Sequence, residues 1–298
     1  MNDGGQCMSL CSPTSLRAMA AGGFACGHLR ASLRTALILT LCFTAAATAA
    51  SPWTPLAEGL DLARFPTGGD NTTVTVLRAD PALWTPDLLC ASELTDGARK
   101  TARDWCADHD LVAAINAGMF ATDYSTHVGY CRVGSHTNSS HVNDYQSAVA
   151  FDPVRPGESP FHIFDLDVPG VSLSRIREDY RCVAQNLRLI KRPGENRWSP
   201  QPRRWTEAAL GEDSSGRMLF IFCEEALSMH DLNELLLSLP VDLVCAQHLE
   251  GGPEAQLFVR VGDTELELIG GFETGFYEST ATLPATRIPF VIGLRRGQ

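Results

Sequence analysis

Two apolar segments in the second half of the chain flank an amphipathic one. Residues 217–223 and 241–250 predict strands, and residues 228–240 predict a helix that begins at the capping residue Ser228. A strand, a helix and a strand with short connections indicate a crossover within one sheet. More strand-like segments follow with little helix between them. We therefore expect an α+β fold, a single domain built on a mixed β-sheet with packed helices.

The rest of the chain carries further short segments of regular structure. Residues 93–110 predict a helix capped by Thr95 or Asp96, and residues 121–145 are polar enough to predict a long loop. Additional strands are expected at residues 71–78, 111–116, 147–153, 161–166, 255–261, 265–269 and 288–296.

The first fifty residues differ from the others. Arg17, Arg30 and Arg34 precede an apolar, alanine-rich run over residues 35–50, an order typical of an export signal. The run is too short to be a good membrane span, although a retained N-terminal anchor is the alternative to cleavage. We expect an export signal over residues 1–50, a domain over 51–298, and a periplasmic or secreted protein.

Charge and cysteine content narrow the choice of partners. The chain has 24 basic and 35 acidic residues, a net charge of -11, so nucleic acid and anionic membrane surfaces are poor partners. Of its ten cysteines, four lie within residues 1–50 and six follow. An even number in an exported protein predicts disulfides, with the shortest loops closed by Cys90–Cys106 and Cys223–Cys245. Buried free thiols are the alternative.

Two predicted strands end in polar residues beside glycine. One turn runs from Asn116 through Gly118 to Phe120, and the other begins at His248. Glycine lets a backbone approach a ligand closely, so polar groups delivered at such turns are candidate substrate contacts. Ordinary tight turns capped by polar side chains are the alternative.

These two turns, in this order, and the C-terminal segment IPFVIGLRR resemble the phosphodiester glycosidase family. The resemblance covers residues 111–295. It implies an exported hydrolase that cleaves a glycosidic linkage in a sugar phosphodiester, with an N-acetylglucosamine-1-phosphodiester-like substrate. Two alternatives remain open, a non-catalytic glycan-binding envelope protein and a hydrolase of another anomeric linkage.

The resemblance also implies roles for individual residues. Glu250 stands where the family has Asp and is the first candidate to stabilise an oxocarbenium ion. Glu207 stands where the family has an Arg, so Arg203, Arg204 or another basic residue would have to bind a phosphate, or else the substrate has none. The substrate-binding candidates are Asn116, Gly118, Phe120, Arg203, Arg204, His248, Gly251, Gly252 and Glu254.

Other polar residues allow two interpretations each. Glu273 offers a second catalytic carboxylate or caps a turn, and His248 orients Glu250 or is a core histidine. The histidines at positions 127, 136 and 141 lie on no regular face, and the chain has no C-x-x-C element, so we expect no metal and no cofactor.

Overall fold

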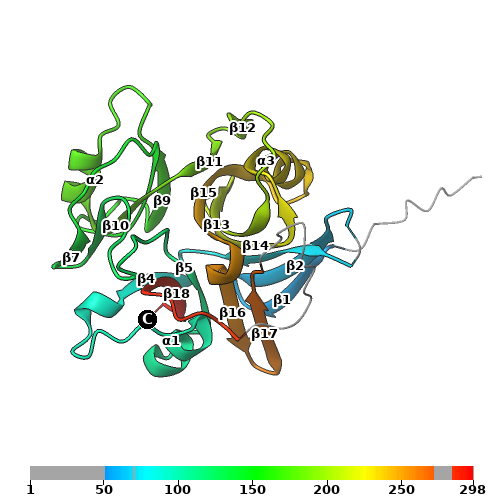
Figure 1. The fold of residues 1–298 in the computed structure, drawn as a ribbon. Coiled ribbons are helices and arrows are strands. Elements are labelled where there is room, and N and C mark those ends of the chain that lie inside the picture. Colours follow the sequence, from blue (N-terminus) through cyan, green and yellow to red (C-terminus); the bar gives the residue numbers. More distant parts are fainter. Residues whose placement is uncertain (1–50, 70, 272–283, 298) are drawn as a thin grey trace, which may run out of the picture. The chain divides into compact units, whose positions relative to one another are not determined.

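Three antiparallel sheets make up most of the described chain (Figure 1). The computed structural model describes residues 51–69, 71–271 and 284–297, which fall in one unit that begins at Ala49. The predicted export signal and Glu273 lie outside the described residues. None of the helices that the structure describes is long and apolar enough to cross a membrane.

The largest sheet has eight strands and carries the second glycine turn. Its strands are, in spatial order, β1 (Trp53–Ala57), β2 (Leu60–Pro66), β3 (Thr73–Ala79), β14 (Met218–Leu227), β13 (Trp205–Asp213), β15 (Leu243–Gly251), β11 (Arg188–Lys191) and β12 (Glu195–Asn196).

Each of the other two sheets has five strands. One is built from β7 (His136–Ser139), β6 (Cys131–Val133), β10 (Tyr180–Asn186), β8 (Ser147–Pro153) and β9 (Phe161–Asp165). The other is built from β17 (Thr264–Ile269), β16 (Gln256–Val261), β5 (Ala113–Asn116), β18 (Phe290–Arg296) and β4 (Trp84–Cys90).

The helices of the described chain are few and short. They are α1 (Ala102–His109), α2 (Leu173–Asp179) and α3 (Met229–Ser238), with single 3₁₀ turns at Ala91–Glu93 and Gly252–Glu254. The prediction for α3 is confirmed, and the Ser228 hydroxyl accepts a hydrogen bond from the Asp231 amide at 3.1 Å. α1 instead begins after the capping residue Thr101, later than predicted, because Gly97 turns the chain in a left-handed conformation just after Asp96.

The prediction of a mixed sheet is wrong, since every strand pairing in the described chain is antiparallel. The segment β14–α3–β15 does cross over, but β13 lies between its two strands and pairs antiparallel with both. The predicted loop over residues 121–145 contains the short hairpin β6–β7. Cys131 and Val133, alternate residues of β6, are buried and anchor this hairpin. Over the described residues the architecture is a β-rich domain with three small helices.

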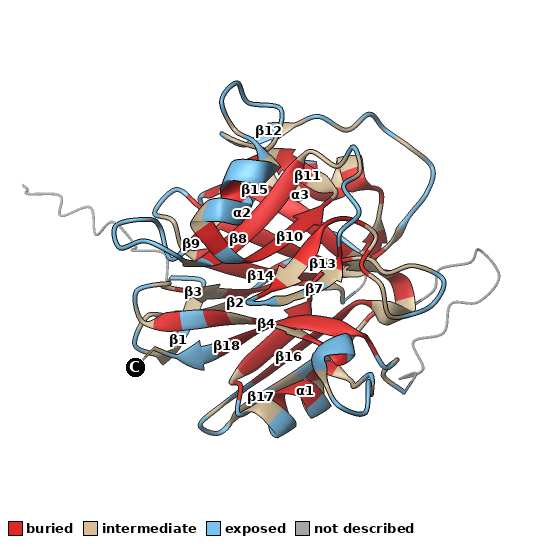
Figure 2. Cartoon of the chain, turned by 90° about the vertical axis from the view of Figure 1, so that its left-hand side faces the viewer, coloured by how far each residue is buried: buried red, intermediate tan, exposed pale blue. Residues whose placement is uncertain are grey.

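All three sheets contribute to one hydrophobic core. Phe151 of β8, Phe220 of β14 and Leu257 of β16 come from different sheets, have no exposed surface and belong to the same cluster. Figure 2 shows this interior as continuous buried strands, with exposed surface on the helices and loops at the margin. The sheets therefore support one another, and a site built on the ends of β13 and β15 rests on a rigid base.

The cysteine pairs predicted from loop length are wrong, because all six cysteines of the described chain are free and buried. Cys90 packs in the central core, whereas Cys106 packs beside Trp105 in a separate cluster. Cys223 and Cys245 likewise belong to different clusters. Loop length says nothing about which face of a strand a side chain occupies, and here the faces keep the proposed partners apart.

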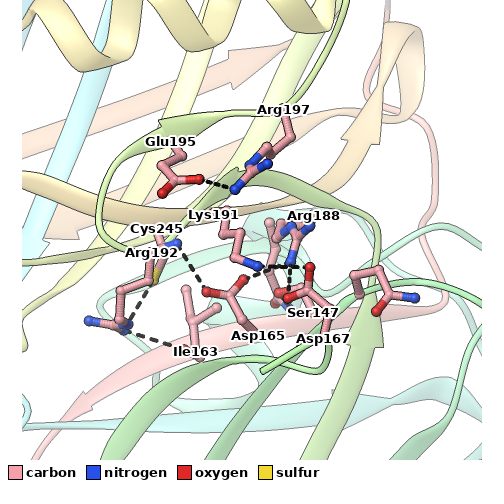
Figure 3. Close-up of polar contacts among 12 residues, drawn as sticks. Ser147, Ile163, Asp165, Asp167, Arg188, Lys191, Arg192, Glu195, Arg197 and Cys245 are labelled. Atoms are coloured by element: carbon pink, nitrogen blue, oxygen red, sulfur yellow. Dashed lines mark hydrogen bonds and ion pairs between the residues drawn. The ribbon is translucent and has the colours of Figure 1, made fainter. Parts of the chain in front are cut away.

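A cluster of ion pairs joins β9 to β11 (Figure 3). Asp165, almost fully buried, lies 3.2 Å from Arg188 and accepts a hydrogen bond from the Arg192 amide at 3.0 Å. Asp167 contacts Arg188 at 2.8 Å and Lys191 at 2.9 Å, and these cations hold its pKa down at about 2. The cluster connects the β9 edge of a five-stranded sheet to the eight-stranded sheet.

Candidate active site

The second glycine turn lines a cavity of about 390 Å³, a size typical of small-molecule sites. Strands β13 and β15, the 3₁₀ turn Gly252–Glu254 and the start of α3 contribute to its walls. The lining residues are Met119, Arg204, Trp205, Met229, His248, Glu250, Gly251, Gly252, Pro253, Glu254 and Gly271.

A buried carboxylate and a buried imidazole face each other across β13 and β15. The Glu207 carboxylate and His248 Nδ1 form a short hydrogen bond, and both residues are almost fully buried. Burial lowers the pKa of His248, but the Glu207 carboxylate more than reverses this, so the pKa lies above its ordinary value. An ionised carboxylate can only accept, so Nδ1 carries a proton. The other ring nitrogen of His248, Nε2, makes no hydrogen bond to the described residues.

Trp205 holds the second oxygen of the same carboxylate. Its indole Nε1 donates to Glu207 Oε2 at 2.6 Å, and its ring meets the His248 ring edge-on at 6.4 Å. Gly251 leaves the space that this indole fills, since a Cβ there would lie 2.3 Å from Trp205 Cδ1. Trp205, Glu207 and His248 therefore form one packed unit, and the glycine is a requirement of that packing.

Glu250 lies two residues beyond His248 on β15 and lines the same cavity. Between them the strand register shifts, so that Leu249 has no partner of its own on β13. Such a bulge redirects neighbouring side chains. Burial raises the pKa of Glu250 to about 7, against the opposing effects of His248 and of the Gly251 amide, which donates to Oε1 at 3.1 Å. The carboxyl therefore exchanges its proton near neutral pH.

Asn116 connects the first glycine turn to the second. Its amide nitrogen donates to the Glu254 carbonyl at 2.8 Å, and its oxygen accepts from the Gln256 amide at 2.7 Å. The side chain is 1% exposed and does not line the cavity. In the structure Asn116 thus fixes the backbone of the 3₁₀ turn that carries Glu254.

Gly118 and Phe120 are not among the residues that line the cavity. Gly118 has a φ of +151°, and a Cβ there would lie 2.3 Å from both His127 Nε2 and Asn186 Oδ1. Phe120 packs edge-on against Phe290 at 6.2 Å. Only Met119 from this turn reaches the cavity.

The two arginine candidates differ in position. Arg204 lines the cavity, with its guanidinium 3.6 Å from Asp231 and half exposed. Arg203 is exposed and is not among the lining residues. Glu254 lines the cavity, and its carboxylate has no hydrogen-bond or ion-pair partner within the described residues.

The structure thus brings together Glu250, His248, Gly251, Gly252, Glu254 and Arg204 from the predicted set. Sequence reasoning missed the pairing of Glu207 with His248 and the part played by Trp205. One signal was available, since a carboxylate in the middle of an apolar strand is costly unless a partner is present. In the described chain, no three His, Cys, Asp or Glu side chains are grouped to hold a metal ion.

Comparison with known proteins adds to this geometry. A family model described as phosphodiester glycosidase matches residues 109–293. The zebrafish N-acetylglucosamine-1-phosphodiester alpha-N-acetylglucosaminidase catalytic domain, auto-inhibited by its pro-peptide, superposes with a TM-score of 0.53 at 10% identity, over 79% of this chain and 81% of that one. A hypothetical protein from Synechocystis has a TM-score of 0.55 at 14% identity, over 82% of this chain and 64% of that one. These identities show a shared fold alone. No functionally curated protein matches the chain by sequence.

Proposed function

Because the chain belongs to the phosphodiester glycosidase family, we propose that its cavity hydrolyses a glycosidic linkage at the anomeric carbon of a sugar. One observation carries the proposal. Glu250, whose pKa is about 7, lines the same cavity as His248. The Glu207 carboxylate accepts a hydrogen bond from Nδ1 of that imidazole. A pair of titratable groups with perturbed pKa values in one cavity is the arrangement that acid and base catalysis needs.

Glu250 is the group that meets the anomeric carbon. Breaking a glycosidic bond develops positive charge on the ring oxygen and the anomeric carbon, and a nearby carboxylate stabilises it. The ionised form performs this role, so Glu250 acts above its pKa of about 7. The apolar walls around it strengthen the interaction, because charges attract more strongly where water is excluded.

His248 is the proton donor. Its pKa lies above the ordinary value because of Glu207, so the imidazolium form persists to higher pH than in a free histidine. Nε2–H gives its proton to the departing oxygen while the anomeric C–O bond breaks. A water molecule then adds its oxygen to the anomeric carbon and returns a proton to Nε2. One water is consumed, two hydroxyl groups are produced, and both side chains recover their initial states.

The charges of the cavity favour another anomeric linkage over a sugar phosphodiester. A phosphodiester anion would approach Glu250 and Glu254, and Arg204, the lining arginine, already faces Asp231. A phosphate also leaves as a stable anion and gains little from a proton donor, whereas a sugar hydroxyl requires one. The His248–Glu207 pair is therefore better matched to an alcohol leaving group.

Residues 1–50 support an exported protein, periplasmic or secreted, that meets glycans outside the cytoplasm. A non-catalytic glycan-binding protein is the second candidate, because the same cavity would bind a sugar without cleaving it. Substrate turnover separates the two.

The test is hydrolysis by the purified protein of a panel of α- and β-linked nitrophenyl glycosides and sugar-1-phosphodiesters. We expect turnover of at least one nitrophenyl glycoside, its loss in Glu250→Gln, and its retention in Glu58→Gln, an exposed control that removes the same charge. Sugar binding without turnover anywhere in the panel would favour the glycan-binding protein.

A further inference from the structure

One carboxylate of the cavity wall, Glu254, is not matched by a cation of the described chain, whereas Glu250, whose pKa is about 7, carries little charge at pH 6. Glu250 and Glu254 both line the cavity, and Glu207 lies behind His248. Glu207 is matched by the imidazole and by the Trp205 indole. Glu254 has no such match, since its carboxylate lacks a hydrogen-bond or ion-pair partner within the described residues.

The cation at the rim does not supply that match. The Arg204 guanidinium lies 3.6 Å from Asp231 of α3 and is 53% exposed on its side chain. Its charge is therefore shared with another acid and screened by water. His248 is the other cationic group, and Glu207 already neutralises it.

The remaining walls of the cavity suit a sugar ring. Trp205 presents an aromatic surface, and Met119 and Met229 add flexible apolar surface. His248 is 3% exposed, and its Nε2 is unpartnered in the described part of the chain while the residue lines the cavity. As an N–H donor at the cavity wall, Nε2 is available to an acceptor oxygen of the sugar.

From these observations we infer that the cavity binds a sugar that carries a free amine, with the ammonium group against the Glu254 carboxylate. The inference rests on the proposed function for the placement of the sugar at Glu250. Its own support is the Glu254 carboxylate, which has no partner within the described residues, and the Arg204 guanidinium, whose charge is shared with Asp231. A neutral acetamido group in the same position leaves Glu254 unpaired, and a phosphodiester adds a like charge, so both bind more weakly.

The test compares two methyl glycosides and one sugar phosphodiester by isothermal titration calorimetry at about pH 6, where a sugar amine is protonated. The probes are methyl glucosaminide, methyl N-acetylglucosaminide and the methyl phosphodiester of N-acetylglucosamine 1-phosphate. We expect the amine to bind about fivefold more tightly than the acetamide, the gain typical of a partly exposed ion pair, with the phosphodiester weakest. The preference for the amine should decline as salt is raised.

Glu254→Gln should remove most of the amine preference, whereas the exposed control Glu58→Gln should keep it. Equal binding of the three probes, tighter binding of the phosphodiester, or an unchanged preference in Glu254→Gln would overturn the inference. Binding does not require turnover, so the outcomes remain distinguishable. An amine preference without hydrolysis defeats the proposed function alone, and hydrolysis without an amine preference defeats this inference alone.

Discussion

The Glu207 carboxylate on β13 accepts a hydrogen bond from Nδ1 of His248 on β15, and both residues are almost completely buried. A buried carboxylate and imidazole are costly to keep in a fold unless each satisfies the other. Their pairing raises the pKa of His248 and leaves Nε2 as the atom available to a substrate.

Glu207→Gln keeps the shape of the side chain and removes its charge. We expect the pKa of His248 to fall, because burial then acts without the opposing carboxylate. In the wild type, kcat/KM should rise with pH through about 7 as Glu250 ionises, and fall again as His248 loses its proton. In the variant the alkaline fall should move to lower pH and the maximum should drop at least tenfold.

The histidine titration can be followed independently by NMR of the imidazole ring. A variant that loses activity with an unchanged alkaline limb would show that Glu207 has only a structural role. An activity that falls, rather than rises, through pH 7 would assign the proton donor to Glu250 instead.

Glu250→Gln should stabilise the fold at alkaline pH. The pKa of Glu250 is raised from 4.5 to about 7, so the folded state binds the proton more tightly than the unfolded state. The wild type therefore loses stability as pH rises from 4.5 to 7, and the loss persists above 7. Because Glu250 is partly exposed, we expect the variant to gain about 1 to 3 kcal/mol at alkaline pH and little below pH 4.5. Urea unfolding at both pH values measures this difference, and an equal gain at both would contradict the assigned pKa.

Gly251→Ala should disrupt the packed unit of Trp205, Glu207 and His248. The new methyl group would lie 2.3 Å from the indole, so Trp205 has to move and its bond to Glu207 lengthens. We expect a loss of about 1 to 3 kcal/mol in stability and a fall in kcat/KM. A shift in tryptophan emission should accompany both effects. Unchanged emission and activity would show that the indole is not held as described.

Arg188→Gln should destabilise the connection between β9 and β11. The substitution leaves the buried Asp165 without its ion-pair partner, and we expect a loss of about 1 to 3 kcal/mol. Arg197→Gln is the matched control, since the Arg197–Glu195 pair is exposed on both sides and contributes little. Thermal unfolding of both variants at neutral pH measures the two losses of stability, and equal melting temperatures would contradict the prediction.

Asp167, whose pKa is about 2, adds stability that is present above its ordinary pKa of 3.8 and is lost as pH falls toward 2.

Local sequence patterns predicted many of the helices and strands of this fold, but they did not predict which strands pair with one another. The leucine spacing and Ser228 cap of α3 and the β-branched run in β3 are local signals, and both elements form where expected. The sheet type depends on β13, whose residues WTEAALGED lack β-branched side chains beyond one threonine, so periodicity alone did not mark it as a central strand. With β13 inserted between β14 and β15, the expected parallel pairing becomes two antiparallel ones.

The candidate site was predictable in part for the same reason. The glycine turn at Gly251 and Gly252 marks a place where the backbone approaches another group, and Glu250 is adjacent to it in sequence. The partner of His248 is 41 residues away on a strand that local patterns did not identify. The sequence predicted that Asn116 binds substrate. In the structure its side-chain nitrogen and oxygen instead bind the backbone at the other glycine turn. Which polar residue faces a ligand and which holds a turn depends on three-dimensional contacts that the sequence does not state.

The most direct test is kcat/KM of Glu250→Gln for the nitrophenyl glycoside that the wild type hydrolyses best, measured above pH 7. We expect a loss of at least about a hundredfold in a variant that remains folded, because the amide cannot stabilise the developing positive charge. A folded Glu250→Gln protein with wild-type kcat/KM would rule out this role for Glu250, since the cavity would then hydrolyse its substrate without the carboxylate assigned to the anomeric carbon.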